Sequence, residues 1–275
     1  MPDIFDVITK WWKYIFGVML LTIVVAGAIV FLKPKKYLAI ATALPAPSYA
    51  SDKAAIFGEN IQVLYPNIGI PDDLDKIVGT ALLDTVYYSV VDQYHVIAYY
   101  KLVNDGEGRQ KAASRLKSNT RVIKSDFGEL KVKVWDQDRN QSALFSNAIM
   151  EALRLMHQEL ENANNSEILG KIKNEYAIKK AEYLALNDSL KNDWFLIMKK
   201  EALSKQLVEY EKLSGEYELM TRLKPQALII VEKARPPLWP DRPKRFQIII
   251  AAAILSFIFS ILMILMLERR KAQPA

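Results

Sequence analysis

The sequence contains no cysteine, and this absence excludes several kinds of chemistry. Without thiols the chain forms no disulfide, no thiolate metal site and no cysteine nucleophile. Histidine is also scarce, because His95 and His157 are the only two and each lies alone on a predicted helix. A lone helical histidine is far more often a packed or surface residue than a ligand or a general base. The sequence therefore predicts no catalytic residue, no metal site and no cofactor site, and we expect a protein that is not an enzyme.

Phosphate-binding glycine loops and nucleophile elbows are also missing from the sequence. Asp126, Phe127 and Gly128 spell the magnesium motif of protein kinases, but the glycine-rich loop, strand lysine and catalytic loop that accompany it are absent, so the match is accidental. The formal net charge of +6 is weak evidence of an anionic partner. Lysine and arginine crowd beside the apolar segments, where lipid headgroups account for them, and we expect no nucleic acid partner.

Two long stretches carry no charged residue at all, and both are strongly apolar: residues 14–32 and 246–267. At the rise of an α-helix the first stretch covers roughly 28 Å, close to the thickness of a bilayer's hydrocarbon core. Trp11 and Trp12 precede the first stretch and Trp239 precedes the second, as in the aromatic belts of membrane proteins. These features predict two transmembrane helices.

A cleaved signal peptide is the competing interpretation of the first stretch. It fits less well, because the apolar run is long and is followed by Lys33-Pro34-Lys35-Lys36 instead of small residues, although Ala41 and Ala43 form a small-x-small pattern further on. Two spans place both tails on one side of the membrane. The positive-inside rule does not say which side, because it applies to short loops and residues 33–245 form a long one.

The segment between the spans predicts a small α/β domain and then a long helical hairpin. Residues 142–223 contain no proline and repeat leucine and tyrosine at heptad-like spacing, with residues 187–189 suited to the hairpin tip and residues 162–166 a second weak point. Strands are expected at 37–44, 120–124, 130–135 and 227–231, and helices from Pro71, over 84–94 and over 111–117. Two apolar stripes on this hairpin need cover, which neighbouring subunits would supply better than a fold back onto the base domain.

Four prolines, Pro236, Pro237, Pro240 and Pro243, fall within eight residues before the second span. They cannot continue a helix or a central strand, so they predict a stiff, extended lead-in that sets the angle between the domain and the membrane. The predicted organisation is a tail (1–13), a first span (14–32), an α/β base domain (33–141), a helical hairpin (142–224), a return strand with the proline-rich lead-in (225–245), a second span (246–267) and a tail (268–275).

Three passages together resemble the Wzz-type chain-length determinants, also called polysaccharide co-polymerases. Residues 37–45 are similar to the first strand of that family. Residues 128–138, running into 143–160, are similar to the strand, aspartate turn and helix where the family's long helix begins. Residues 231–244 resemble its proline-rich segment before the second span. The order of elements extends the resemblance over the whole chain.

The resemblance implies an α+β membrane protein of the bacterial inner membrane, with both termini cytoplasmic and a central periplasmic domain built from a small mixed sheet and a long helical hairpin. It implies a ring- or bell-shaped homo-oligomer that regulates the chain length of a surface polysaccharide, O-antigen or a similar lipopolysaccharide glycan. The expected partners are further copies of the chain, a separate membrane polymerase, the lipid bilayer and glycan, with no cofactor.

The sequence departs from that family in two respects. Its helical arms are short, so the bell would be squat, and its second span contains no glycine. Ala252, Ser256 and Ser260 supply the small-xxx-small spacing instead, and we expect them to pack helices in the bilayer. No tyrosine kinase domain of the kind that some relatives carry is present.

Two other functions remain open from the sequence. A periplasmic adaptor for capsule or exopolysaccharide export would share this architecture. A membrane-anchored sensor is a third alternative, against which the short stretch after the second span, residues 268–275, argues.

Overall fold

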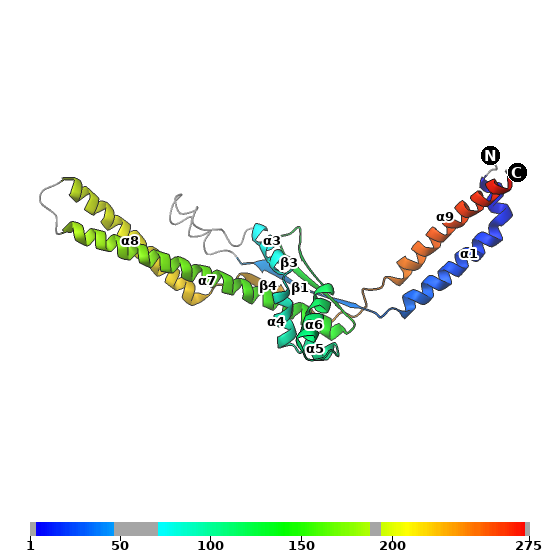
Figure 1. Ribbon diagram of the computed structural model, residues 1–275, viewed down its shortest axis with the longest axis horizontal. Helices are drawn as coiled ribbons and strands as arrows, with labels where there is room; N and C mark the ends of the chain where they lie inside the picture. The colour runs from blue at the N-terminus through cyan, green and yellow to red at the C-terminus, as the bar shows by residue number, and fades with distance from the viewer. Residues whose placement is uncertain (1–3, 47–70, 188–193, 273–275) are drawn as a thin grey trace. The chain divides into compact units, whose positions relative to one another are not determined.

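The computed structural model describes residues 4–46, 71–187 and 194–272 and divides the chain into two compact units. The first unit contains residues 1–39, 134–144 and 235–275, and the second contains residues 40–133 and 145–234. The architecture is α+β: two apolar terminal helices flank a domain with a four-stranded sheet and two long helices (Figure 1). This is the predicted fold class.

The terminal helices α1 (Ile4–Leu32) and α9 (Arg245–Ala272) lie side by side, with the start of α1 and the end of α9 at the same end of the pair (Figure 1). Thr9–Leu32 and Arg245–Leu267 are long and apolar enough to cross a membrane, with mean hydropathies of 2.8 and 3.0. Only 11% and 17% of their apolar windows are buried, unlike the core helices of a soluble domain. Both helices extend beyond the stretches that the sequence predicts, because the flanking residues continue the helix past the apolar run.

The sheet has the strand order β2-β3-β1-β4, so the strand after the first apolar helix lies next to the strand before the second. The strands are β1 (Tyr37–Pro45), β2 (Thr120–Lys124), β3 (Leu130–Asp136) and β4 (Leu228–Glu232). Strand β1 pairs antiparallel with β4, with Thr42 opposite Glu232 and Pro45 opposite Leu228. Alanines 39, 41 and 43 alternate along β1 with at most 2% exposed, and such small side chains let other elements approach the sheet closely. The four predicted strands are present, within one or two residues of the expected bounds.

The turn between β2 and β3 explains the accidental kinase-like triplet. Gly128 adopts a φ of 74°, which glycine reaches without strain, and its N–H donates to the Ser125 carbonyl at 3.0 Å. The Ser125 N–H donates in turn to the Glu129 carbonyl at 2.8 Å. Phe127 is 87% exposed at this turn. Aspartate and glycine stand here because a tight turn favours them.

Among the described residues, four short helices precede β2 and β3: α3 (Pro71–Thr80), α4 (Asp84–Gln93), α5 (Val96–Tyr99) and α6 (Gly106–Ser118). Helix α6 starts five residues before the predicted basic helix. Asp105 is its N-cap and accepts a hydrogen bond from the Gly108 N–H at 2.6 Å, and this cap offsets the poor helix propensity of the two glycines. The core includes Phe145, whose ring lies 5.6 Å from that of Tyr99.

The helical hairpin consists of α7 (Arg139–Asn187) and α8 (Trp194–Leu223). Asp138 starts α7 three residues before the predicted position, because its Oδ1 accepts from the Asn140 N–H at 2.7 Å. The 49 residues of α7 run through positions 162–166 without interruption, which makes the helix about 74 Å long. The predicted tip at 187–189 lies largely outside the described residues. All the heptad-like residues are buried or half-buried: Leu169, Ile172, Tyr176, Tyr183, Leu186, Leu203, Leu207, Tyr210, Leu213, Tyr217 and Met220.

Candidate functional site

The described ranges contain no cluster of three or more histidine or acidic residues that could hold a metal ion. The candidate functional site is a group of structural contacts. It lies where the two apolar helices continue into the extended chain of the same unit. We call this place the membrane-side junction and define it by Lys36, Trp135, Asp241, Arg242 and Arg245.

The junction begins with a short backbone pairing between the chain that leaves α1 and the chain that enters α9. The Lys36 N–H donates to the Arg242 carbonyl at 2.9 Å. The Lys36 carbonyl accepts from the Asp241 N–H at 2.9 Å and from the Arg242 N–H at 3.2 Å. These hydrogen bonds fix the distance between the two segments, a few residues from the end of α1 and the start of α9.

The side chain of Trp135, only 8% exposed, is the second part of the junction. Its indole Nε1–H donates to Asp241 Oδ2 at 2.7 Å, and the Arg242 guanidinium carbon lies 4.0 Å from the centre of its ring. A buried indole N–H is costly to leave unpaired, so the carboxylate and the cation together hold the ring at the end of β3. Closer to the helices, the Arg245 guanidinium lies 4.6 Å from the centre of the Phe31 ring.

The four predicted lead-in prolines surround this junction. Pro237 and Pro243 are half-buried, whereas Pro236 and Pro240 are exposed, and the bond between Arg242 and Pro243 is cis. Apart from the pairing with Lys36, the lead-in forms neither helix nor strand, which is the extended path expected of it. That the prolines set an angle between domain and membrane stays a prediction.

The three small residues predicted to pack helices lie along one side of α9. Ser256 and Ser260 are 7% and 4% exposed, and Ala252 is half-buried. Each serine hydroxyl donates to a carbonyl of its own helix: Ser256 to Ala253 at 2.9 Å and Ser260 to Ser256 at 2.7 Å. Because these hydroxyls are satisfied within α9, the serines act toward α1 as small residues and not as hydrogen-bond donors. Their role in packing helices in the bilayer stays a prediction.

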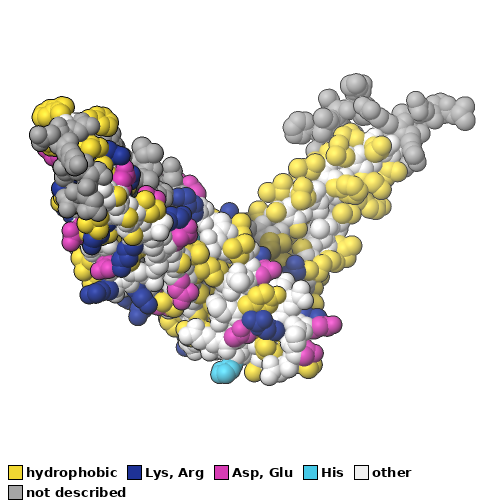
Figure 2. Space-filling model, turned by 60° about the vertical axis from the view of Figure 1, so that its left-hand side comes forward, with side chains coloured by type: hydrophobic (Ala, Val, Ile, Leu, Met, Phe, Trp, Pro, Cys, Tyr) yellow, Lys and Arg dark blue, Asp and Glu magenta, His cyan; other side chains and the backbone are white. Residues whose placement is uncertain are grey.

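Larger side chains complete the contact between the two apolar helices. Ile15 and Ile264 are buried together, with Trp11, Ile261 and Leu265 packed against them. An apolar groove beside this contact is lined by Trp11, Tyr14, Val18, Phe259, Ser260, Met263, Ile264 and Leu267. On the face that Figure 2 shows, many hydrophobic side chains lie on this helix pair, whereas the hairpin carries charges of both signs. The sequence predicts the small residues but not their isoleucine partners.

In the second unit, Asn147 of α7 ties the long helix to the end of the return strand. Its amide nitrogen donates to the Ala234 carbonyl at 3.0 Å, and its amide oxygen accepts from the Ala234 N–H at 2.7 Å. The side chain thus pairs with the backbone as a neighbouring strand would. It fixes the path of the chain just beyond β4.

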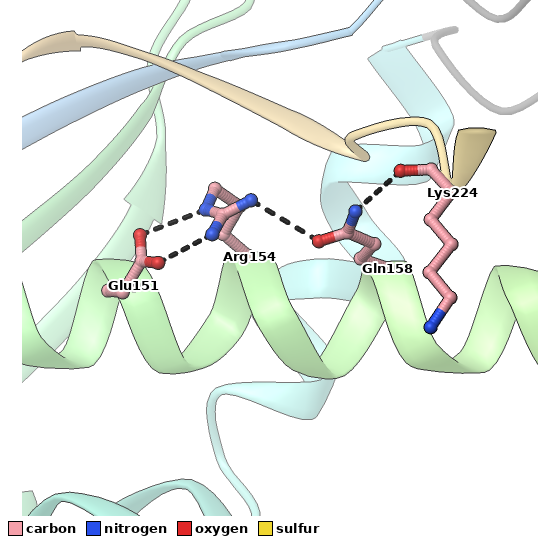
Figure 3. Close-up of polar contacts among 4 residues, drawn as sticks. All are labelled: Glu151, Arg154, Gln158 and Lys224. Carbon is pink, nitrogen blue, oxygen red and sulfur yellow. Dashed lines mark hydrogen bonds and ion pairs between the residues drawn. The ribbon is translucent and has the colours of Figure 1, made fainter. Parts of the chain in front are cut away.

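A chain of polar contacts joins α7 to the end of α8 (Figure 3). Arg154 forms a two-pronged ion pair with Glu151, with nitrogen–oxygen distances of 2.9 and 2.5 Å, and donates to Gln158 at 3.3 Å. Gln158 donates to the Lys224 carbonyl at 2.5 Å. Lys224 has a φ of 46°, the left-handed conformation that ends many helices. The hydrogen bonds and charge of Arg154 lower the pKa of the Glu151 carboxyl.

The sequence contains Trp135, Asp241 and Asn147 in the passages that carry the family resemblance, but sequence reasoning assigned them no role. One signal was available, because an aspartate among four prolines has few local donors and so invites a distant partner. The identity of that partner depends on the sheet bringing residues 135 and 241 together, which no local pattern reveals.

No family model matches the chain, and no curated protein matches it. Among solved structures, the chain is similar to a full-length bacterial polysaccharide co-polymerase, with a TM-score of 0.43 and 14% sequence identity over 100% of this chain and 99% of that one. It is also similar to a fragment of WzzB, a polysaccharide co-polymerase from Salmonella Typhimurium, with a TM-score of 0.36 and 13% identity over 76% of this chain and 100% of the fragment.

Proposed function

We propose that this protein regulates the chain length of a surface polysaccharide, O-antigen or a similar lipopolysaccharide glycan, as a non-enzymatic scaffold in the bacterial inner membrane. It acts as a ring-like homo-oligomer beside a separate membrane polymerase. Both termini are cytoplasmic and the central domain is periplasmic, where glycan is within its reach.

The order and pairing of the elements carry this proposal. Strand β1 follows the first apolar helix, β4 precedes the second, and the two strands pair in the sheet from which the long hairpin leaves. This is the order that the family resemblance implies.

Exposed apolar side chains on the hairpin support the homo-oligomer. Six large aliphatic residues of α7 and α8 are at least half exposed: Leu160 (57%), Ile178 (51%), Leu184 (55%), Val208 (65%), Leu219 (54%) and Leu223 (65%). Both helices therefore carry apolar surface that a partner would cover. A second copy of the chain fits it, because closed homo-oligomers present the same face on every subunit. Cross-linking of the full-length chain in membranes should give a ladder that ends at one closed size, and an exclusively monomeric chain would count against the ring.

The decisive experiment measures the length distribution of the surface glycan on gels, in cells with and without the gene. Deletion should collapse a clustered band pattern into a short random ladder, and restoring the gene should restore the cluster. If deletion removes most polysaccharide from the surface but leaves its length distribution unchanged, the protein is an adaptor for capsule or exopolysaccharide export. If neither changes, the proposed function is wrong although the architecture stands.

A further inference from the structure

Basic residues outnumber acidic ones where the chain leaves α1 and enters α9. Residues 33–39 and 235–245 contain seven basic residues and one acidic residue, Asp241. Asp241 is occupied by the Trp135 indole at 2.7 Å and by Arg242 at 3.8 Å. Lys33, Lys35, Lys244 and Arg245 form no ion pair with the described part of the chain. We call these four residues the basic collar.

Geometry places the basic collar at the ends of the two apolar helices. Helix α1 ends at Leu32 and α9 begins at Arg245, so every collar residue lies within three positions of a helix end. At the reach of an extended chain this is at most about 11 Å, so these side chains can reach a headgroup layer roughly 5–8 Å thick. The pairing of Lys36 with Arg242 keeps the two halves of the collar together.

Exposed apolar side chains accompany these charges. Leu238 and Trp239 are 79% and 81% exposed in the lead-in, and Phe246 is 77% exposed in the first turn of α9. A large side chain of this kind is unfavourable in water but suits the boundary between headgroups and acyl chains, where tryptophan is enriched. The Phe31 ring, with its centre 4.6 Å from the Arg245 guanidinium, holds that charge beside the end of α1.

We propose that the basic collar binds the phosphate groups of anionic phospholipids, in the leaflet that faces the central domain, while Leu238 and Trp239 insert beside them. The charge complementarity and the continuity of the collar with the two apolar helices select lipid as the occupant. This inference requires that α1 and α9 cross a bilayer, but it does not depend on any role in polysaccharide synthesis.

The test uses the full chain in mixed micelles of detergent with phosphatidylcholine and phosphatidylglycerol in a known ratio. The lipids that co-purify are quantified by mass spectrometry. The original chain should be enriched in phosphatidylglycerol. In a variant with Lys33→Gln, Lys35→Gln, Lys244→Gln and Arg245→Gln, the enrichment in phosphatidylglycerol should fall at least tenfold. Each basic residue near an anionic surface strengthens binding to that surface roughly fivefold.

Two control variants separate the collar from overall charge and from misfolding. A chain with Lys111, Lys171, Lys180 and Lys205 changed to glutamine loses the same charge from the other unit and should keep its phosphatidylglycerol. A collar with arginine at positions 33, 35 and 244 and lysine at 245 should also keep it. Equal enrichment in the collar glutamine variant and the original chain, or equal loss in the Lys111 control set, would overturn the proposal.

Quenching of tryptophan by phosphatidylcholine brominated near the headgroup tests the insertion separately. In vesicles, brominated lipid should remove less tryptophan fluorescence from Trp239→Phe than from the original chain. The fluorescence that brominated lipid leaves should change less. If the substitution removes only unquenched emission, Trp239 lies in water and the inserted part of the proposal is wrong.

Discussion

The long helices that the structure describes form two pairs, α1 with α9 and α7 with α8, and different forces hold the two pairs together. Helices α1 and α9 bury Ile15 against Ile264, and most of their apolar windows is exposed. Helices α7 and α8 instead bury one narrow seam and join across it with two ion pairs, Lys173–Glu218 at 2.6 Å and Lys199–Glu182 at 2.9 Å.

This difference indicates different solvents around the two pairs. In water, burying an apolar seam is itself the driving force, so the hairpin needs only one apolar stripe per helix. In lipid, an apolar side chain gains little on leaving the acyl chains, so close approach of small residues must supply the attraction. The predictions below test this contrast, from the largest expected effect to the smallest.

Two isoleucines of equal exposure give the strongest test. Ile172 in the hairpin and Ile264 in the span pair are both 7% exposed. Ile172→Ala should destabilise the central domain by about 2–4 kcal/mol, because the lost side chain leaves a cavity in a water-surrounded seam. Ile264→Ala should weaken the α1–α9 contact by less than about 1 kcal/mol, because lipid chains solvate what the substitution exposes.

Urea unfolding of the full chain in nanodiscs, followed by circular dichroism, measures the first effect. Dissociation of the apolar helices during titration with a denaturing detergent measures the second. Equal costs for the two substitutions would mean that the two helix pairs share one environment, and the membrane assignment of α1 and α9 would fail.

Enlarging Ser260 should separate size from hydrogen bonding in the span pair. Ser260→Leu should weaken the α1–α9 contact by about 1–3 kcal/mol, because the larger side chain does not fit a position that is 4% exposed. Ser260→Ala should change it little, because the hydroxyl bonds only to its own helix. Ala251→Leu, on an exposed position of the same helix, is the control for added bulk. The same detergent titration compares all three, and a large loss for Ser260→Ala would show a hydrogen bond between helices.

Substitutions at the membrane-side junction test whether contacts outside the bilayer also hold α1 and α9 together. Asp241→Ala leaves the buried Trp135 indole N–H without its acceptor and should cost about 1–3 kcal/mol. Trp135→Phe with Asp241→Ala should cost less than the sum of the two single changes, since each already removes the same bond. A double-mutant cycle on the thermal unfolding of the full chain measures this coupling. Additive costs would mean that the hydrogen bond contributes nothing.

Acid should weaken the hairpin, because protonation of the half-buried His157 in α7 destabilises it. The contact between α1 and α9 should be unaffected. Burial lowers the pKa of His157 below its ordinary 6.5, because the charged form is poorly solvated there, and its Nε2 has no hydrogen-bond partner among the described residues. A lowered histidine pKa means that the unfolded chain binds the proton more readily. The stability contributed by neutral His157 is therefore complete above pH 6.5 and is lost as the pH falls toward the folded pKa.

His157→Phe should flatten the dependence of unfolding free energy on pH below 6.5. A second variant, His95→Asn, removes the other histidine at a position with a φ of 51°, which asparagine tolerates. Urea unfolding at a series of pH values compares the two variants. An unchanged slope in His157→Phe would assign the acid sensitivity to carboxylates.

Sequence reasoning found what depends on local patterns and missed what depends on the sheet. Charge-free runs reveal the apolar helices, period-two alternation reveals the strands, and heptad spacing gives seam positions of which none is exposed. The early start of α6 was missed because the cap at Asp105 is one hydrogen bond that outweighs two glycines. The hydrogen bond between Trp135 and Asp241 joins residues 106 positions apart. It forms only because the fold pairs segments that are distant in the sequence.

The ion pair between Lys173 and Glu218 should have the smallest effect of all. The hydrogen bond from Lys173, and then its charge, lower the pKa of the Glu218 carboxyl from its ordinary 4.5. Its contribution is present above that value and is lost as the pH falls through the folded pKa. Both side chains remain substantially exposed, 54% and 41%, so water and salt screen the pair strongly.

Exchanging the two residues, Lys173→Glu with Glu218→Lys, should recover the stability that either single change loses. In urea unfolding at pH 7, each single change should shift the midpoint by a small part of the shift caused by Ile172→Ala. A shift as large as that of Ile172→Ala would mean that charge, and not the apolar seam, holds the hairpin together.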